Sequence, residues 1–375
     1  MPTSTSPQID TLTDTLTHLV RLPTVTGNLA TNRAALEWIE AELKDTPLII
    51  RRGEHNGVPY LTATTPAVKD PKRPKLWLAA HTDVVPANPR DFVPRIEDNK
   101  LYGRGVFDMK YAIAIFITLL KELGDELSHY DLGLMLTCDE ETGGHDGAAL
   151  LADRGYASQA MLLPECGIPW NLESGAKSLS WWQLTSRGQD AHGAYPWLGQ
   201  HPLDQLLSYI DEMRTHFVKE PCHNPDHPHH NMTVGAIEGG DVYNRVPSVA
   251  TAKLDLRTMP DVSLEEVTSW FADAALKFPG VTAELAESAP GFTNPSDDAT
   301  KLFRRLVREE TGRELTSKIA HASSDARYFA VHGNQVICVP PTGGGQHSSD
   351  EWIDLGDLDK FYEIIRRFVQ EWTAV

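Results

Sequence analysis

The chain has 375 residues, 41% of them hydrophobic, and 34 Lys and Arg against 52 Asp and Glu give a net charge of −18 at pH 7. At roughly 150 residues per domain, this length predicts two domains with cores of their own and excludes a small scaffold held by disulfides. The negative charge repels nucleic-acid phosphates and anionic membrane surfaces, so we expect neither as a partner.

Cysteine usage and the N-terminal segment bear on the compartment. The four cysteines lie far apart, without a CxxC pair, which is typical of a reducing compartment. No basic segment leads into an apolar one at the N-terminus, and no apolar run reaches the ~20 residues of a membrane span. We therefore predict a cytoplasmic protein.

Short apolar runs alternate with amphipathic helical patterns in the first half of the chain and again near its end. This alternation predicts an α/β layer structure that contains parallel strands. Continuous apolar runs are typical of strands buried on both faces. The expected strands are residues 76–80, 132–137, 160–163 and 335–339, and the expected helices are residues 9–20, 33–43, 109–123 and 357–372.

The middle of the chain has a different pattern. A strand is expected from residue 178, then a helix at 202–217, strands at 232–237 and 250–257, a helix at 264–278 and a last strand at 281–285. This order is compatible with a small α+β sandwich. We therefore predict that residues 178–287 form a domain inserted between residues 1–177 and 288–375, which together form a larger domain.

Histidine and acidic side chains follow several of the predicted strands. Ligands of open α/β sheets collect beyond the carboxyl ends of the strands, so these side chains are expected to converge. Histidine and carboxylate together are typical of a Zn²⁺ site, with Mn²⁺ or Co²⁺ as substitutes, and a shared carboxylate can hold two ions. One acid after a strand is usually a solvated turn or a helix cap, so the argument depends on the whole set. The set is His81, Asp83, Asp108, Glu140, Glu141, Glu165 and His347.

Four stretches of the sequence carry a family resemblance: LAAHTDVVP, LYGRGVFDMK, LTCDEETGG and GGGQHSSDEW. In this order they resemble the signature of the di-zinc amidohydrolase superfamily, which includes acetylornithine deacetylase, succinyl-diaminopimelate desuccinylase, aminoacylases and glutamate carboxypeptidase. The resemblance implies a zinc-peptidase-like catalytic domain with a central mixed sheet flanked by helices. It also implies that the inserted α+β sandwich is a lid and dimerisation domain.

The resemblance also implies a role for each residue of the set. Two divalent ions, zinc by the resemblance, would be held by five ligands: His81 and Glu165 on the first ion, Glu141 and His347 on the second, and Asp108 on both. Asp83 would fix the ring of His81 from behind. Glu140 would take a proton from the water between the ions and hand it to the leaving amine.

One predicted ligand departs from the family pattern. The family has Glu or Asp followed by Pro at this position, whereas this chain reads Pro164-Glu165-Cys166. We prefer Glu165 because it directly follows a predicted strand, with Glu173 as the alternative ligand. Cys166 is interpreted as a small apolar filler rather than as a zinc ligand.

Residues of the predicted inserted domain and one later loop resemble the family's remaining site residues. His192 would reach the partner subunit's site and stabilise the oxyanion, which implies a homodimer. Asn244, Arg257 and Ser324 would contact the substrate, although Arg257 could equally form a structural ion pair. Ala326 stands where the family has a glycine, which leaves the local backbone conformation open.

The segment at residues 221–230 is rich in His and Pro. Its composition is compatible with a metal site, but its prolines and irregular spacing favour an exposed loop of the inserted domain.

The leading hypothesis is a metal-dependent hydrolase that cleaves an amide or peptide bond in an N-acyl amino acid or small peptide with a free carboxylate. Within this class, a dipeptidase or carboxypeptidase is the alternative to a deacylase. A non-catalytic relative that binds acyl amino acids is a second class. A nucleotide-dependent oxidoreductase is disfavoured because Gly103-Arg104-Gly105 lacks the third glycine of the fingerprint, and no GxSxG motif supports a serine hydrolase.

Overall fold

The computed structural model describes residues 7–165, 167–217, 229–294 and 296–375. Its contacts divide the chain into two compact units. Unit 1 comprises Met1–Ser174, Asn294–Lys318 and Ser324–Val375, and unit 2 comprises Gly175–Thr293 and Ile319–Ser323. Cys166 and most of the His- and Pro-rich segment lie outside the described residues.

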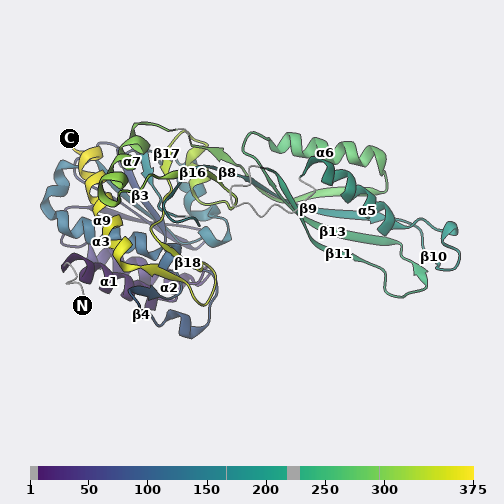
Figure 1. The fold of residues 1–375 in the computed structure, drawn as a ribbon, viewed down its shortest axis with the longest axis horizontal. Coiled ribbons are helices and arrows are strands. Elements are labelled where there is room, and N and C mark those ends of the chain that lie inside the picture. Colours follow the sequence, from purple (N-terminus) through teal and green to yellow (C-terminus); the bar gives the residue numbers. More distant parts are fainter. Residues whose placement is uncertain (1–6, 166, 218–228, 295) are drawn as a thin grey trace. The chain divides into compact units, whose positions relative to one another are not determined.

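Unit 1 is built on a six-stranded mixed sheet (Figure 1). Strand β3 runs parallel to β6 and β7, and β17 runs parallel to β7, whereas β1 and β2 are antiparallel to their neighbours. The fold is therefore α/β with a central mixed sheet, as predicted. The order across the sheet is β1 (Ile49–His55), β2 (Val58–Thr64), β6 (Leu132–Thr137), β3 (Leu76–His81), β7 (Ala160–Leu162) and β17 (Gln335–Ile337).

Helices cover this sheet because its central strands are apolar on both faces. Leu76, Leu78 and Ala80 of β3 belong to one core with α1, α3 and α9, while the alternate residues Trp77 and Ala79 are buried on the opposite face. Four helices pack against one another: α1 (Pro7–Arg21), α3 (Tyr111–Leu123), α7 (Asp298–Thr311) and α9 (Leu355–Thr373). The other α-helices of unit 1 are α2 (Leu29–Glu42), α4 (Leu150–Asp153) and α8 (Ala326–Ala330).

The hairpin of β1 and β2 is an element that we did not predict. Its turn residues Asn56 and Gly57 both have positive φ, at 47° and 86°. These values match the type I′ turn that Asn-Gly favours, so the dipeptide was a usable signal.

A second, four-stranded sheet in unit 1 lies beside two loops of the predicted site. Its order is β18 (Gly343–Gly344), β19 (Trp352–Asp354), β5 (Lys100–Tyr102) and β4 (Arg95–Glu97). The segment after β5 leads to Asp108, and the segment between β18 and β19 contains His347. This sheet therefore brings two loops that are distant in sequence to one place.

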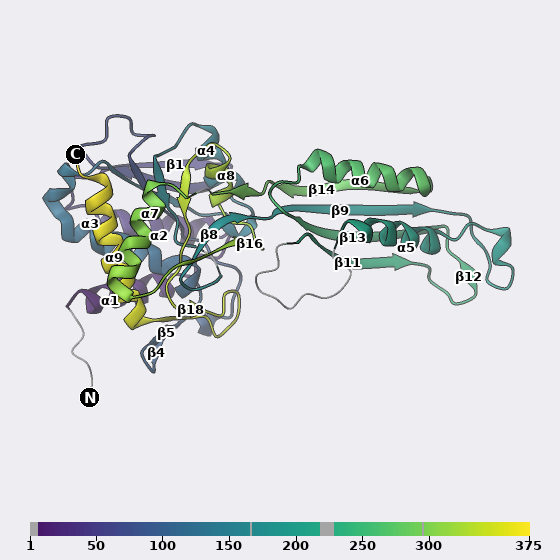
Figure 2. The same cartoon turned by 45° about the horizontal axis from the view of Figure 1, so that its top comes forward.

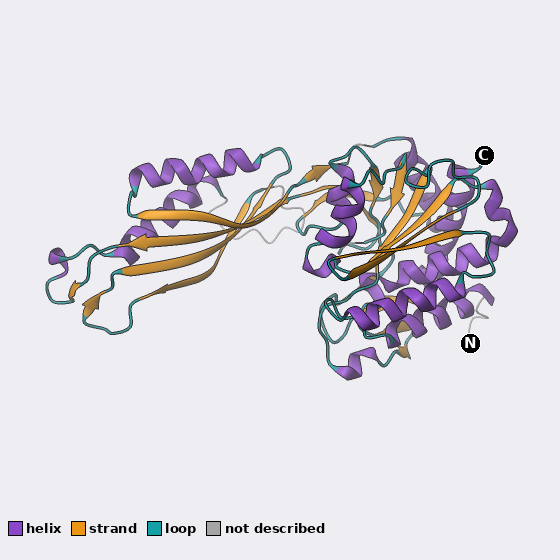
Figure 3. Ribbon diagram, turned by 180° about the vertical axis from the view of Figure 1, so that it is seen from behind, coloured by secondary structure: helices purple, strands orange, loops and turns teal. Residues whose placement is uncertain are grey.

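Unit 2 is an α+β sandwich, as predicted. Helices α5 (Pro202–Met213) and α6 (Leu264–Lys277) cover one face of an antiparallel sheet (Figures 2 and 3). Along β9 the side chains alternate, so that Trp182 and Leu184 are buried while Trp181 is exposed. The sheet order is β11 (Asn231–Gly239), β13 (Val249–Thr258), β9 (Ser178–Arg187) and β14 (Val281–Ala289).

The remaining strands are short. A three-stranded sheet has the order β15 (Phe292–Thr293), β8 (Asn171–Ala176) and β16 (Thr316–Ala320), and β10 (Ala191–His192) pairs with β12 (Arg245–Val246). Among the described helices, none combines the length and the apolar composition needed to cross a bilayer.

Candidate metal centre

Five side chains of unit 1 form two overlapping groups of potential metal ligands. His81, Asp108 and Glu165 make up the first group, and Asp108, Glu141 and His347 make up the second, with the ligand atoms of each group within 4.8 Å of one another. The structure thus brings together all five predicted ligands, and Asp108 is the member that both groups share.

The first group is centred on His81, which lies at the end of β3 and is 2% exposed. Its Nε2 atom lies 3.2 Å from Oδ1 of Asp108 and 3.9 Å from Oε1 of Glu165. Its Nδ1 atom lies 3.0 Å from the carbonyl oxygen of Asp83. An Nδ1–H that donates to this carbonyl leaves the lone pair of Nε2 facing the carboxylates, which is the tautomer a metal ligand needs.

Asp83 lies behind His81 and is fully buried. Its Oδ1 lies 3.4 Å from Nδ1 of His81, and its two oxygens accept the backbone N–H groups of Glu140 and Glu141 at 3.3 Å each. The Thr26 hydroxyl donates to the same carboxylate at 2.7 Å. Asp83 therefore fixes the histidine and the Glu140–Glu141 turn together.

The second group is more open. Nε2 of His347 lies 3.3 Å from Oδ2 of Asp108 and 3.1 Å from Oε2 of Glu141. The His347 side chain is 54% exposed, whereas that of Glu141 is 6% exposed. Because the two oxygens of Asp108 face different histidines, this carboxylate has the arrangement of a bridging ligand.

Three side chains of the ligand groups have pKa values that are shifted from their usual values. Burial and the neighbouring Glu140 raise the pKa of Glu165 well above its usual value. Burial also opposes ionisation of Asp108, but hydrogen bonds from His347 and His81 hold its pKa far below the ordinary range. Hydrogen bonds to Asp108 and Glu141 raise the pKa of His347 to about 10. The site stabilises positive charge strongly, as expected of a cation site.

The donor set also fits a divalent ion. Oε2 of Glu165 is buried and has no hydrogen-bond partner among the described residues, and such an atom is costly unless something else pairs with it. Imidazole nitrogens and carboxylate oxygens are the ligands that Zn²⁺, Co²⁺ and Mn²⁺ accept.

Glu140 begins a short 3₁₀ turn (Glu140–Thr142) soon after β6 ends. Burial is the main reason that its pKa is raised well above the usual value, and the carboxylates of Asp325, Asp108 and Asp83 add to the effect. Asp325 is a buried acid that we did not single out, although it lies in the predicted substrate loop. The base candidate therefore lies within the electrostatic field of both ligand groups.

Three further points from the sequence concern unit 1: Glu173, Ser324 and Ala326. The ligand groups among the described residues contain Glu165 rather than the alternative Glu173. Ser324 is 4% exposed, and its carbonyl accepts a bond from Nη1 of Arg327 at 3.0 Å. Ala326 begins helix α8 and does not adopt a positive φ, so the missing glycine causes no strain here.

His192 and Asn244 lie together in unit 2. The N–H of Ala194 donates to Nδ1 of His192 at 3.0 Å, which leaves Nε2 of a neutral ring to carry the proton. Gly193 donates to the carbonyl of Asn244 at 2.6 Å. A Cβ at Gly193 would lie 2.8 Å from the carbonyl carbon of Asn244, which explains the glycine after the histidine.

Large aromatic side chains close in sequence to His192 and Asn244 are exposed on unit 2. Tyr195 is 53% exposed, Trp197 is 73% exposed and Tyr243 is fully exposed. The rings of His192 and Tyr195 lie 5.8 Å apart, and those of Tyr195 and Trp197 lie 5.7 Å apart. Exposed apolar clusters of this kind are typical of interaction surfaces.

Arg257 takes part in an ion pair within its own strand. Its Nε and Nη2 donate to the two oxygens of Asp255 at 2.9 Å and 3.3 Å. The structural alternative that we kept open for Arg257 is therefore present, and a substrate carboxylate would have to share the guanidinium with Asp255.

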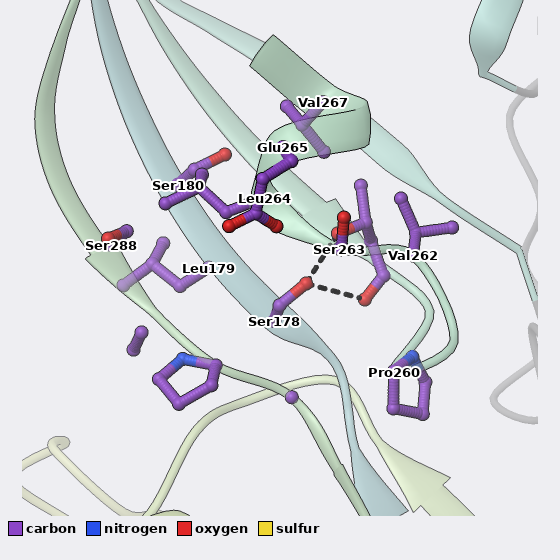
Figure 4. Close-up of a pocket in the computed structure, with 14 residues that line it drawn as sticks. Ser178, Leu179, Ser180, Pro260, Val262, Ser263, Leu264, Glu265, Val267 and Ser288 are labelled. Carbon is purple, nitrogen blue, oxygen red and sulfur yellow. Dashed lines mark hydrogen bonds between the residues drawn. The ribbon is translucent and has the colours of Figure 1, made fainter. Parts of the chain in front are cut away.

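Unit 2 also contains a recess of about 340 Å³ at the start of helix α6 (Figure 4). The hydroxyl of Ser178 donates to the carbonyl of Thr258 at 3.3 Å there, and Ser180 and Ser288 also line the wall. None of the predicted site residues lines this recess.

Comparison with known proteins agrees with this geometry. The model of Peptidase family M20/M25/M40 matches residues 77–371. A succinyl-diaminopimelate desuccinylase of Delftia acidovorans is 31% identical over 321 residues, which is 80% of this chain and 82% of the relative.

Solved structures share the fold. Aminopeptidase PepT from Bacillus cereus superposes with a TM-score of 0.80 at 20% identity, covering 97% of this chain and 98% of its own. The M20 family metallo-carboxypeptidase Sso-CP2 from Sulfolobus solfataricus gives 0.75 at 16% identity, covering 96% and 99%. The chain belongs to peptidase family M20/M25/M40, and it is a metal-dependent hydrolase of amide or peptide bonds.

Proposed function

We propose that this enzyme removes the acyl group from an N-acyl amino acid, or cleaves a small peptide, that carries a free carboxylate. The observation that carries the proposal is the pair of ligand groups sharing Asp108, with the buried acid Glu140 beside them. The desuccinylase relative supports the deacylase hypothesis, because its name describes removal of an acyl group from an amino acid.

Two divalent ions are part of this proposal. His81, Glu165 and Asp108 would hold one, and Glu141, His347 and Asp108 would hold the other. We propose zinc as the native metal, with Co²⁺ or Mn²⁺ as substitutes. When bound, such ions lower the pKa of a water and polarise a carbonyl.

The residues of the chain itself supply the proton transfers. Glu140 accepts a proton from the attacking water and delivers it to the departing nitrogen, for which its raised pKa is suitable. Asp83 keeps His81 and the Glu140–Glu141 turn in place throughout. The Nε2–H of His192 donates to the oxygen of the carbonyl under attack.

Substrate recognition is assigned to three polar side chains. Arg257 would bind the free carboxylate through its planar guanidinium, in competition with Asp255. Asn244 and Ser324 would donate further hydrogen bonds. Ser324 Oγ is buried without a hydrogen-bond partner among the described residues, which is compatible with a ligand supplying one.

We also propose a homodimer in which His192 serves the site of the partner subunit. The exposed aromatic side chains of Tyr195 and Trp197 beside this histidine support an interface there. A cytoplasmic location is proposed from the cysteines, which lie far apart in the sequence without a CxxC pair, and Cys138 is a free buried thiol.

A substrate panel tests the proposal. The purified enzyme would be assayed with N-acetyl and N-succinyl amino acids and with dipeptides, each in the presence of Zn²⁺, Co²⁺ or Mn²⁺. We expect the N-acyl amino acids to be hydrolysed fastest. Faster cleavage of dipeptides would favour the dipeptidase or carboxypeptidase alternative, and binding without turnover would favour the non-catalytic one.

A further inference from the structure

The loop that carries Asp108 (residues 103–108) runs into an irregular helical turn at Val106–Lys110, whose backbone angles are not helical at Asp108 and Met109. Gly103 and Gly105 adopt φ values of 155° and 77°, and Asp108 itself has φ −125° and ψ 88°. A shared ligand in such a loop needs another support, because ligand geometry must be fixed to within about 0.5 Å.

The support comes from one carboxylate on a different loop. Oε1 of Glu351 accepts the backbone N–H groups of Phe107 at 2.9 Å and Asp108 at 3.0 Å. Oε2 accepts the backbone N–H of Gly105 at 2.8 Å and Nη1 of Arg104 at 2.9 Å. Every one of these donors belongs to the Asp108 loop.

Glu351 is 1% exposed, so its charge is removed from water almost completely. Burying a carboxylate is costly unless hydrogen bonds satisfy it, and bonds to an ionised acceptor are about twice as strong as neutral ones. The four donors therefore fix the loop and the acid to each other.

Glu351 also belongs to the loop that carries His347. The carbonyl of Glu351 accepts the N–H of Gly103 at 3.1 Å, so backbone and side chain both join the two loops. His347 adopts a positive φ of 62°, and its side chain is 54% exposed. Little packing holds this imidazole, so its position depends on how its loop is anchored.

We propose that Glu351 is a positioning residue that sets the spacing between Asp108 and His347, and thereby controls retention of the ion held by Asp108, Glu141 and His347. This inference rests on the proposed function, because it takes that group to be a metal site. His81 and Glu165 lie on other segments, so the ion of the first group depends less on Glu351.

The substitution Glu351→Gln tests the inference at nearly constant volume. An amide nitrogen would replace one oxygen and would face the N–H donors of the loop, which removes the bonds on that side. Asp131→Asn is a matched control, because Oδ1 of Asp131 accepts the N–H of Lys75 at 2.9 Å just before β6 begins, at the opposite end of the strand from the site.

The readout is metal binding rather than turnover. Chelator-treated proteins would be titrated with Zn²⁺ by calorimetry and with Co²⁺ by visible absorption. We expect Glu351→Gln to bind the second ion about 10- to 100-fold more weakly than the wild type, while the first ion changes little. The control variant should bind both ions like the wild type.

If Glu351→Gln binds two ions with wild-type affinities, this inference is wrong, but the proposed function still stands. A wild-type protein that takes up no divalent ion would overturn the proposed metal chemistry and this inference with it. Should Glu351→Gln not fold, Glu351→Asp keeps the charge but shortens the reach. An intermediate loss of the second ion would support the inference, and unchanged affinity would contradict it.

Discussion

The candidate metal centre of unit 1 and the exposed surface around His192 in unit 2 present their candidate residues in opposite ways. His81, Asp83 and Glu165 are at least nine-tenths buried, and hydrogen bonds fix His81 and Asp83. His192 and Tyr243 are exposed. The comparison teaches that unit 1 brings its candidate residues together within itself, whereas unit 2 exposes its candidate residues, whose proposed role requires another surface.

The largest effect is expected from Glu140→Gln in unit 1. Removing the proton acceptor should lower kcat by about 10³-fold or more, since general acid–base catalysis contributes 10²–10⁴-fold and this residue is proposed to act twice. Metal content, measured by mass spectrometry, should stay at the wild-type level because Glu140 is not in either ligand group. Substantial remaining activity would remove Glu140 from this role.

His192→Gln tests the other side of the comparison. Loss of one oxyanion donor should lower kcat by about 10²- to 10³-fold while the melting temperature is unchanged, because the side chain is exposed. His201→Gln, also in unit 2, serves as the control. Equal kcat values for the two variants would show that His192 is only a surface residue.

Asp357→Asn affects stability rather than catalysis. Trp170 and Arg313 donate to this buried carboxylate at 3.0 Å and 2.8 Å, and Thr342 also bonds to it. Burial opposes ionisation, but these bonds lower the pKa of Asp357 to about 2.

Because the folded-state pKa lies below the unfolded value, the contribution of Asp357 is present above about pH 4 and is lost as the pH falls toward 2. We expect Asp357→Asn to reduce the free energy of unfolding by about 2 kcal/mol at pH 7. Urea titrations should show that difference shrinking between pH 4 and 2. A difference that does not change with pH would contradict the assignment.

Arg257→Lys should have the smallest effect. A lysine keeps the charge but loses the two parallel bonds of the guanidinium, so KM for a carboxylate-bearing substrate should rise about 10-fold with kcat nearly constant. A truncated substrate that lacks the carboxylate provides the control, since its KM should not change. An equal rise in KM for both substrates would show that Arg257 does not bind the substrate carboxylate and only forms its ion pair with Asp255.

Most of the secondary structure could be predicted because buried strands and helices have regular patterns of apolar residues in the sequence. The apolar runs at 76–80 and 132–137 are strands β3 and β6, and the helix expected at 357–372 is α9. Helix α3 begins at Tyr111 rather than at residue 109, because Asp108 and Met109 have non-helical backbone angles. Apolar periodicity does not report such local departures.

The predicted metal ligands could be found from the sequence, whereas the residues that support them could not. His81 comes at the end of a buried strand and Glu165 soon after one, so topology alone suggests that they converge. Thr26 and Glu351 act by hydrogen bonding to a carboxylate or to backbone N–H groups. No recognisable sequence pattern marks such hydrogen-bond partners, so only the structure reveals them.

The central claim is that bound divalent ions are required for amide hydrolysis at the group of ligands around Asp108. The most direct test is to remove metal from the purified enzyme with a chelator and then to follow hydrolysis of an N-succinyl amino acid against added Zn²⁺. We predict that activity is lost on chelation and returns as Zn²⁺ is taken up, and that Asp108→Asn shows no such recovery. Undiminished hydrolysis by the metal-free protein would contradict the account.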